Sequence, residues 1–377
     1  MKALLMLEDG MVFEGEAIGA SGVSTGEVVF TTGMTGYQEM LTDPSFRGQI
    51  LTLTYPLIGN YGVVELDEES ERVQVAGFVV RELCDTPSNW RSTGDLGSYL
   101  KRNGVVGIQG IDTRALTRHL RNKGVMMGAI SHEHTRDELR AILAEAPAYD
   151  TRDFVRECSI REPTLWTGGC GDDPVRAKWL TQAEETRYRV ALLDLGVKRN
   201  ILRSLNYVGC EVTVWPCTTT AQEILDAKPD GIFLSPGPGD PSRLGYLYDT
   251  VNKLAVSGTP VAGICLGHQL MAYAFGGRSY KLTFGHRGGN HPVKDLATGR
   301  VSITSQNHGY AVDPETIKDT GLEVSHINMN DNTVEGLRHK EYPVFTIQYH
   351  PEASPGPRDS SYLFAEFVKH IEANRPA

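Results

Sequence analysis

The sequence Gly263-Ile264-Cys265-Leu266-Gly267-His268-Gln269 lies between two apolar segments. The run Pro260-Val261-Ala262 before it predicts a buried strand, and Leu270–Phe275 after it predicts a helix that ends at Gly276-Gly277. A cysteine flanked at this spacing by glycines is typical of a nucleophile elbow, because a side chain at either glycine would clash with the adjoining strand and helix. The stretch therefore predicts a strand, a sharp turn that carries Cys265, and a helix.

Cys265 would lie at the N-terminus of the predicted helix. Unpaired N–H groups and the positive end of the helix dipole favour a thiolate over a thiol at such a position. A free cysteine is, however, also commonly buried and inert in a protein core. This stretch alone leaves two interpretations of Cys265 open, a nucleophile and a core residue.

Length, charge and cysteine spacing restrict the class of protein. The 377 residues are too many for one typical core and suit two domains. The net charge of −10 argues against a nucleic-acid partner and against an anionic membrane surface. The apolar run within residues 1–9 is too short for a signal peptide and no run approaches a membrane span, so we expect a cytoplasmic protein. The six cysteines include no C-x-x-C pair, which indicates neither a disulfide scaffold nor a zinc site.

The first 60 residues predict short strands. Asp9-Gly10 lies between two apolar runs and indicates a hairpin, because a type I′ turn needs positive φ at both central positions. Gly26–Phe30 and Ile50–Thr54 are further strand candidates. The segment between them, Met34–Ser45, is expected to be a surface connection with a turn at Asp43-Pro44-Ser45.

Two helices are predicted later in this half of the chain. They begin near Asp112 and near Thr135, since each residue can cap a segment with apolar side chains one turn apart. The basic residues on the first of these helices are expected to form a solvated face rather than a binding patch.

Apolar periodicity is lost between about residues 147 and 187. The most loop-like point is Gly168–Pro174, where glycine, aspartate and proline cluster. We therefore expect an N-terminal domain over residues 1–150, a linker region over 151–187 and a C-terminal domain over 188–377.

From Arg189 onward, predicted strands and helices alternate. This alternation implies right-handed crossovers and a parallel sheet covered on both faces. We therefore expect an α/β fold in which a doubly wound, mainly parallel sheet carries the cysteine elbow, beside a separate β-rich α/β N-terminal domain. In such sheets the active site lies beyond the carboxyl ends of the strands. The candidate strands are 190–194, 212–215, 231–234 and the run into Cys265, and the candidate helices are 198–206, 221–227 and 246–256.

Two more loops at these carboxyl ends are chemically suggestive. In Ser235–Pro241, glycines let backbone N–H groups approach a ligand and prolines stiffen the loop, although an ordinary turn has the same composition. In His350-Pro351-Glu352, the histidine follows a strand-like run and can act as general base to a cysteine, while the acid can hold its imidazole in one tautomer. Together with Cys265 these loops supply a nucleophile, a base, an orienting acid and an anion hole, which favours the nucleophile interpretation.

The sequence resembles the class I (triad) glutamine amidotransferases, whose signature is a G-x-C-x-G elbow followed far downstream by H-P-E. The N-terminal region narrows the resemblance to the small (glutaminase) subunits of carbamoyl-phosphate synthetases. The similarity spans nearly the full chain and is weakest at about 135–187. Its further motifs are Gly26–Phe30, Met34–Glu39, Leu41–Ser45, Leu53–Asn60, Gly110–Arg114, Gly285–Pro292 and Gln306–Tyr310.

The resemblance implies a role for each motif. Cys265 would attack the side-chain amide of L-glutamine, His350 would pass the proton to departing ammonia, and Glu352 would orient His350. The N–H groups of two of the substrate contacts, Leu266 and Gly239, would face the oxyanion. Ser45 would make the N-terminal domain contribute to the glutamine site. The residues that match the family's glutamine contacts are Ser45, Gly237, Gly239, Leu266, Gln269, Asn307, Gly309 and Tyr310.

The resemblance also implies a partner. Formation of carbamoyl phosphate needs ATP, yet this chain has no recognisable phosphate loop and no carboxylate cluster suited to Mg²⁺. We therefore expect no cofactor and no metal in this chain. ATP and Mg²⁺ would bind to a large synthetase subunit, which would form a heterodimer or a higher oligomer with this chain through the N-terminal domain. Ammonia would pass to that subunit through a tunnel, and the product would feed arginine or pyrimidine biosynthesis.

Other functions are compatible with parts of the sequence. The elbow and H-P-E would equally suit the glutaminase of another synthase, such as one making anthranilate or GMP, but the 150-residue N-terminal domain does not fit that alternative. A non-catalytic scaffold that regulates a synthetase is a second alternative. A hydrolase of small γ-glutamyl compounds that needs no partner is a third.

Overall fold

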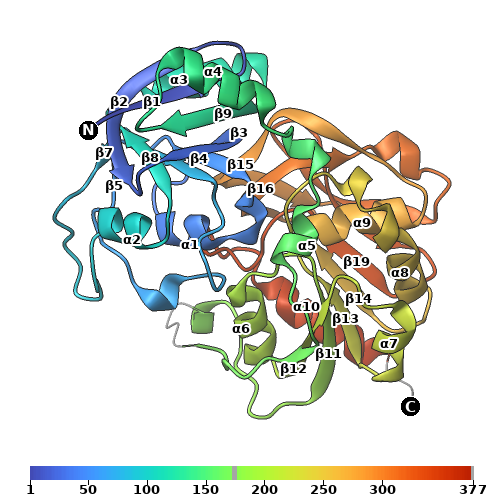
Figure 1. Ribbon diagram of the computed structural model, residues 1–377. Coiled ribbons are helices and arrows are strands. Elements are labelled where there is room, and N and C mark those ends of the chain that lie inside the picture. Colours follow the sequence, from blue (N-terminus) through green and yellow to red (C-terminus); the bar gives the residue numbers. More distant parts are fainter. Residues whose placement is uncertain (172–175, 375–377) are drawn as a thin grey trace. The chain divides into compact units, whose positions relative to one another are not determined.

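The computed structural model describes residues 1–171 and 176–374 (Figure 1). Parts of two predicted segments, residues 172–175 of the linker and 375–377 of the C-terminal domain, lie outside the described residues. Within the described ranges, no helix combines the length and the apolar character needed to cross a lipid bilayer.

The chain divides into two compact units. Unit 1 comprises Met1–Phe154 together with Thr283–Gly288, and unit 2 comprises Val155–Leu282 together with Gly289–Ala377. The predicted linker is not structureless in its described part, because it contains helix α5 (Phe154–Cys158) and a short strand that pairs within unit 2.

Unit 1 is built on a closed barrel. The first two strands form the predicted hairpin, with Gly10 at φ 90° in the turn. Apolar residues from every strand fill the barrel, among them Leu5, Val28 and Ile50. The β-rich fold predicted for this region is confirmed, and closure of its sheet is an additional finding. In order around the barrel the strands are β1 (Lys2–Leu7), β2 (Val12–Gly19), β8 (Val106–Gln109), β6 (Gly77–Val79), β4 (Gln49–Leu53), β3 (Val23–Thr31) and β9 (Met126–Ser131).

One segment of unit 1 differs from its prediction. The expected surface connection at Met34–Ser45 contains helix α1 (Tyr37–Thr42), whose apolar side chains are buried, so that prediction was wrong. The helix lacks a capping side chain of its own, and the backbone N–H of Gly36 instead donates to the hydroxyl of Tyr61 at 2.6 Å. The sequence pattern did not show this helix because its start depends on a residue far away in the sequence.

Two of the other helices of unit 1 begin at the predicted caps. Asp112 accepts a hydrogen bond from the N–H of Ala115, and Thr135 forms a capping box with Glu138. These two helices are α3 (Thr113–Lys123) and α4 (Arg136–Glu145), whereas α2 (Leu96–Arg102), which Asp95 caps, was not predicted. A separate short parallel pair is formed by β5 (Leu57–Ile58) and β7 (Glu82–Leu83).

Unit 2 is built on one mixed sheet whose centre is parallel. Strands β12, β11, β13, β14 and β19 run parallel, which confirms the predicted doubly wound sheet, and the strands beyond β19 continue it antiparallel. Residues 283–288 of β15 group with unit 1. The sheet order is β10 (Thr164–Leu165), β12 (Cys210–Pro216), β11 (Tyr188–Asp194), β13 (Gly231–Leu234), β14 (Val261–Ile264), β19 (Val344–Ile347), β18 (Val334–His339), β17 (Leu322–Asn328), β15 (Ser279–Asp295) and β16 (Val301–Val312).

Helices cover both faces of the parallel strands (Figure 1). Alternate residues of β11 face opposite ways: Ala191 and Leu193 pack with α7 (Ala221–Asp226), α8 (Gly245–Ala255) and α9 (Leu266–Ala274). Val190 and Leu192 pack with the two helices of the other face, α6 (Arg199–Tyr207) and α10 (Tyr362–Asn374). This layering leaves the carboxyl ends of β11, β13, β14 and β19 next to one another, where the loops of the candidate site begin.

Candidate active site

Cys265 forms the turn between β14 and α9. Its backbone has φ 50° and ψ −102°, a conformation that side-chain-bearing residues rarely adopt. The flanking glycines are required by close packing. A Cβ at Gly267 would lie 2.6 Å from the carbonyl oxygen of Leu234, and one at Gly263 would lie 3.0 Å from the side chain of Thr346. The elbow is thus held between β13 and β19 in a strained geometry that aims one cysteine beyond the sheet edge.

The sulfur of Cys265 is nearly inaccessible to solvent. The residue is 2% exposed, and its backbone N–H donates to the carbonyl of Ile347 at 2.8 Å. The sulfur lies 3.7 Å from the carbonyl oxygen of Asn307, one of the predicted site residues. Because Leu266 is the first residue of α9, its N–H has no acceptor within the helix and remains available for a ligand.

His350 and Glu352 form a buried pair behind Cys265. His350 Nδ1 lies 2.7 Å from Glu352 Oε1, and both residues are at most 2% exposed. The other ring nitrogen, Nε2, is buried without a hydrogen-bond partner among the described residues. It is therefore the atom of His350 left for the sulfur and for a substrate.

Lys198 completes this arrangement. Its ammonium group lies 3.0 Å from Glu352 Oε1 and also donates to the carbonyl of Ala353. Lys198 follows β11 in a turn that Asp194 stabilises by accepting hydrogen bonds from the N–H groups of Gly196 and Val197. Lysine is almost never fully buried unless it is paired, so this ion pair accounts for its place in the interior.

The charges shift the pKa values of both members of the pair. Burial favours a neutral His350, but the Glu352 carboxylate and the interaction with Cys265 outweigh it and raise the pKa of His350 to about 10. Burial would likewise raise the pKa of Glu352, but Lys198 and His350 hold this pKa well below its usual range. At neutral pH His350 is therefore an imidazolium.

A second histidine beside the elbow behaves differently. His268 is fully buried, and burial, with a smaller effect of His326, lowers its pKa to about 3. Its Nδ1 lies 3.0 Å from the hydroxyl of Thr346. Among the residues that the structure describes, no carboxylate contributes to its pKa in the way that Glu352 does for His350, so His268 is a neutral structural residue.

The loop after β13, residues 235–241, packs closely against the segment after β11 and against Leu266. The hydroxyl of Ser235 accepts from the N–H of Leu195 at 2.8 Å. A Cβ at Gly237 would lie 2.1 Å from the carbonyl oxygen of Leu195, and Gly239 has φ 95°. Both glycines are thus required by the backbone, and the loop lies beside Leu266, whose side chain would be 2.8 Å from a Cβ at Gly237.

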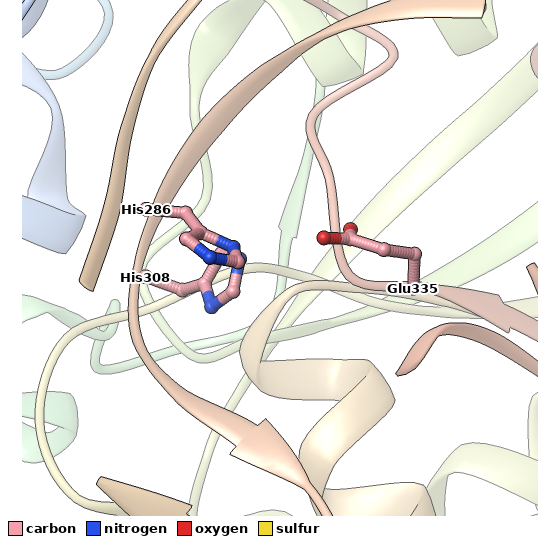
Figure 2. Close-up of side chains that lie close together, drawn as sticks. All are labelled: His286, His308 and Glu335. Atoms are coloured by element: carbon pink, nitrogen blue, oxygen red, sulfur yellow. The ribbon is translucent and has the colours of Figure 1, made fainter. Parts of the chain in front are cut away.

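A network of buried hydrogen bonds supports the segment that contains Asn307, Gly309 and Tyr310. The side-chain nitrogen of Gln306 donates to Glu335 at 3.0 Å. The side-chain oxygen of Gln306 lies 2.9 Å from His308 Nε2. Figure 2 shows His308 and Glu335 with their polar ends turned toward one another. His308 Nδ1 lies 2.8 Å from the carbonyl of Tyr310, so the network ties this segment to β18.

Gln269 and Ser45 complete the predicted set. Gln269 is buried on α9, and its Nε2 donates to the carbonyl of Tyr310 at 2.8 Å. Ser45 belongs to unit 1, whereas the other predicted residues belong to unit 2. The hydroxyl of Ser45 is buried and has no hydrogen-bond partner among the described residues.

Sequence analysis missed two residues of this arrangement, Lys198 and Gln348, the second of which accepts from Gln269 Nε2 at 3.0 Å. Lys198 carried a usable signal, since a lysine two residues after the glycine that ends a parallel strand lies at the carboxyl edge of the sheet. Gln348 carried none, because a polar residue near the end of a strand usually faces solvent.

Two family descriptions match the chain. "Carbamoyl-phosphate synthase small chain, CPSase domain" matches residues 5–130, and "Glutamine amidotransferase class-I" matches residues 191–370.

Curated relatives match over the full length. The carbamoyl phosphate synthase small chain of Syntrophotalea carbinolica is 54% identical over 376 residues, which cover 100% of this chain and 99% of the relative. The protein of the same name from Akkermansia muciniphila is 51% identical over 375 residues, with the same coverage, and that from Nostoc sp. is 50% identical over 383 residues, covering 100% of this chain and 97% of the relative. The similarity therefore extends through both units.

The charge state of His350 is testable by removing its carboxylate partner. In Glu352→Gln the ring stays buried but loses the negative charge beside it, so the pKa of His350 should fall by about one to three units. NMR titration of the chain with labelled histidine rings measures this value directly.

Glu366→Gln on the exposed face of α10 is the matched control, because within the described ranges Glu366 bonds only to the surface residue Lys369. This control should leave the titration of His350 unchanged. Identical titration curves for the native chain and Glu352→Gln would contradict the assignment.

Proposed function

Because the chain belongs to the family of carbamoyl phosphate synthase small chains, we propose that it is the glutaminase subunit of that enzyme. In this role it hydrolyses L-glutamine and delivers ammonia to a large, ATP-dependent synthetase subunit that makes carbamoyl phosphate from bicarbonate. The observation that carries the proposal is the buried chain Lys198–Glu352–His350 beside the strained elbow cysteine.

In the first half of the reaction the sulfur of Cys265 attacks the side-chain carbonyl carbon of glutamine. The carbonyl oxygen becomes an oxyanion that the N–H groups of Leu266 and Gly239 face. A single donor of this kind typically contributes a factor of about 10² to 10³ in rate. His350 then gives its Nε2 proton to the departing nitrogen, the C–N bond breaks, and ammonia leaves a γ-glutamyl thioester on Cys265.

Water completes the reaction. His350, now neutral, takes a proton from water while the water oxygen attacks the thioester carbonyl. The C–S bond breaks, glutamate leaves, and the sulfur and the imidazolium return to their starting charges. The sum is glutamine plus water giving glutamate, ammonia and one proton, with no redox step. Glu352 keeps His350 Nδ1 engaged throughout, so the ring presents Nε2 in both halves.

We assign substrate binding to the residues implied by the resemblance. Several of these residues would contribute mainly through their backbone, which suits the tightly packed Gly237, the positive φ of Gly239 and the hydrogen-bonded segment that ends at Tyr310. The residues of this group are Gly237, Gly239, Asn307, Gly309 and Tyr310. The unpartnered buried hydroxyl of Ser45 is consistent with a polar ligand contact.

The chemistry assigned to this chain needs neither a cofactor nor a metal. ATP and Mg²⁺ would be used on the large subunit, with which this chain would form a heterodimer or a higher oligomer. A non-catalytic scaffold would not need a buried imidazolium beside a cysteine, and the glutaminase of another synthase would not need unit 1. These two arguments favour the proposed function over its alternatives.

Unit 1 offers a candidate docking residue for the large subunit. Trp90 is 93% exposed, although the residues on either side of it are both held by contacts within unit 1. Asn89 donates to the carbonyl of Tyr61 at 3.3 Å, and Arg91 forms an ion pair with Asp67 at 2.9 Å. A large aromatic side chain on a preorganised turn is typical of an interface hot spot, because little entropy is lost when it is buried.

Trp90→Ala should weaken the complex with the large chain about tenfold or more in Kd, as expected for a hot-spot residue. Titration calorimetry of the two chains measures this affinity. Trp179→Ala, which removes a half-exposed tryptophan of unit 2, is the matched control and should change Kd much less. Equal affinities of the Trp90→Ala and native chains would rule out this docking residue.

The proposed function is tested by glutamine-dependent synthesis of carbamoyl phosphate. The chain is mixed with the large chain of the same organism, and either glutamine or free ammonia is supplied. Cys265→Ser should abolish synthesis from glutamine and leave synthesis from ammonia intact, because only the nucleophile is lost. A Cys265→Ser complex that still uses glutamine, or a native complex that uses only ammonia, would contradict the proposal.

A further inference from the structure

Gln348 is a buried amide without a role in the chemistry described above. It follows β19, and its N–H donates to the carbonyl of Glu335 at 2.9 Å, which continues the pairing of β19 with β18. The residue is 0% exposed. Its side-chain amide lies 3.0 Å from Nε2 of Gln269. Gln348 thus lies directly behind a residue assigned to the glutamine site.

The direction of each amide follows from hydrogen-bond chemistry. The carbonyl oxygen of Tyr310 can only accept, so the atom of Gln269 that lies 2.8 Å from it must be the nitrogen. The same nitrogen faces Gln348, which must therefore present its oxygen. Both hydrogens of Gln269 Nε2 are used by these two acceptors. The oxygen of Gln269 is left as an acceptor, to which no described residue donates.

Gln348 fixes the orientation of the Gln269 amide, but within the part of the chain that the structure describes its own side-chain nitrogen is left without a hydrogen bond. Its own Nε2 is buried and has no hydrogen-bond partner among the described residues. Unpaired buried donors are rare in folded proteins because their hydration is lost without replacement. A neutral oxygen acceptor at this depth requires an amide or a hydroxyl, since a carboxylate would add an uncompensated buried charge. The unpaired nitrogen of Gln348 is explained if the role of this residue is to present its oxygen as an acceptor to Gln269 Nε2.

We propose that Gln348 is a positioning residue that makes the enzyme selective for amides bearing an α-amino group. This inference rests on the proposed function. With the nitrogen of Gln269 fixed by Gln348 and Tyr310, its oxygen accepts from the α-ammonium group of glutamine. Hydrogen bonds to an ionised partner are about twice as strong as neutral ones. Rotating the Gln269 amide by half a turn would set two oxygens against its own oxygen and present N–H groups to the ammonium.

The test compares two substrates in the complex with the large chain. One is glutamine and the other is 4-carbamoylbutanoate, which has the same amide and carboxylate but no α-amino group. The acids formed, glutamate and glutarate, are quantified by chromatography. Gln348→Met keeps the approximate volume and removes the acceptor. Gln348→Leu removes the acceptor with a different shape, in case the first variant does not fold.

For either apolar variant, kcat/KM for glutamine should fall about tenfold to a hundredfold, mainly through KM. For 4-carbamoylbutanoate, kcat/KM should stay within about twofold, because that substrate never uses the Gln269 oxygen. Gln222→Met, which changes an exposed glutamine on α7, is the matched control and should leave both values unchanged.

Equal losses for the two substrates, or no loss for either, would overturn the inference and leave the proposed function standing. A native complex that hydrolyses no glutamine would instead overturn the proposed function and, with it, this inference. Synthesis of carbamoyl phosphate from free ammonia by each variant complex shows that the variant has folded and assembled.

Discussion

The arrangement of the site depends on one buried carboxylate. Glu352 lies within 3.0 Å of both Lys198 and His350 through the same oxygen, and all three residues are excluded from solvent. Two positive charges thus meet one negative charge in the interior. A negative charge on the sulfur of Cys265 or on the substrate oxyanion would balance the excess. Removing one partner from a buried ion pair typically costs about 3–5 kcal/mol, because the remaining charge is left buried without compensation.

The sheet brings these groups together from distant parts of the sequence. Lys198 follows β11, Cys265 follows β14, and His350 and Glu352 follow β19, which lie close in the sheet order. Parallel strands place their carboxyl ends on one edge of the sheet, so short loops are enough to bring these side chains together. The glycines at 263, 267 and 237 let these backbone segments pack closely against one another, since a Cβ at any of the three would lie 3.0 Å or less from a neighbouring atom.

Local patterns predicted the part of the site that local structure determines. The elbow at Cys265, the loop after β13 and the histidine after β19 each end a strand with a recognisable pattern, and the alternation of strands and helices predicted the sheet. The pairing of Lys198 with Glu352 joins residues that only the folded sheet brings together, and the orientation of Gln348 depends on two hydrogen bonds made by Gln269. The buried helix α1 was missed for the same reason, because Tyr61 caps it from outside the local pattern.

The central claim is that this charge arrangement makes Cys265 the nucleophile toward glutamine. Its most direct test is to mix the complex with isotopically labelled glutamine, quench it in acid during turnover, and locate the label in the digested chain by mass spectrometry. The account predicts a γ-glutamyl group on the peptide containing Cys265, and on no other peptide. Turnover of glutamine without any label on that peptide, even when hydrolysis is slowed, would contradict it.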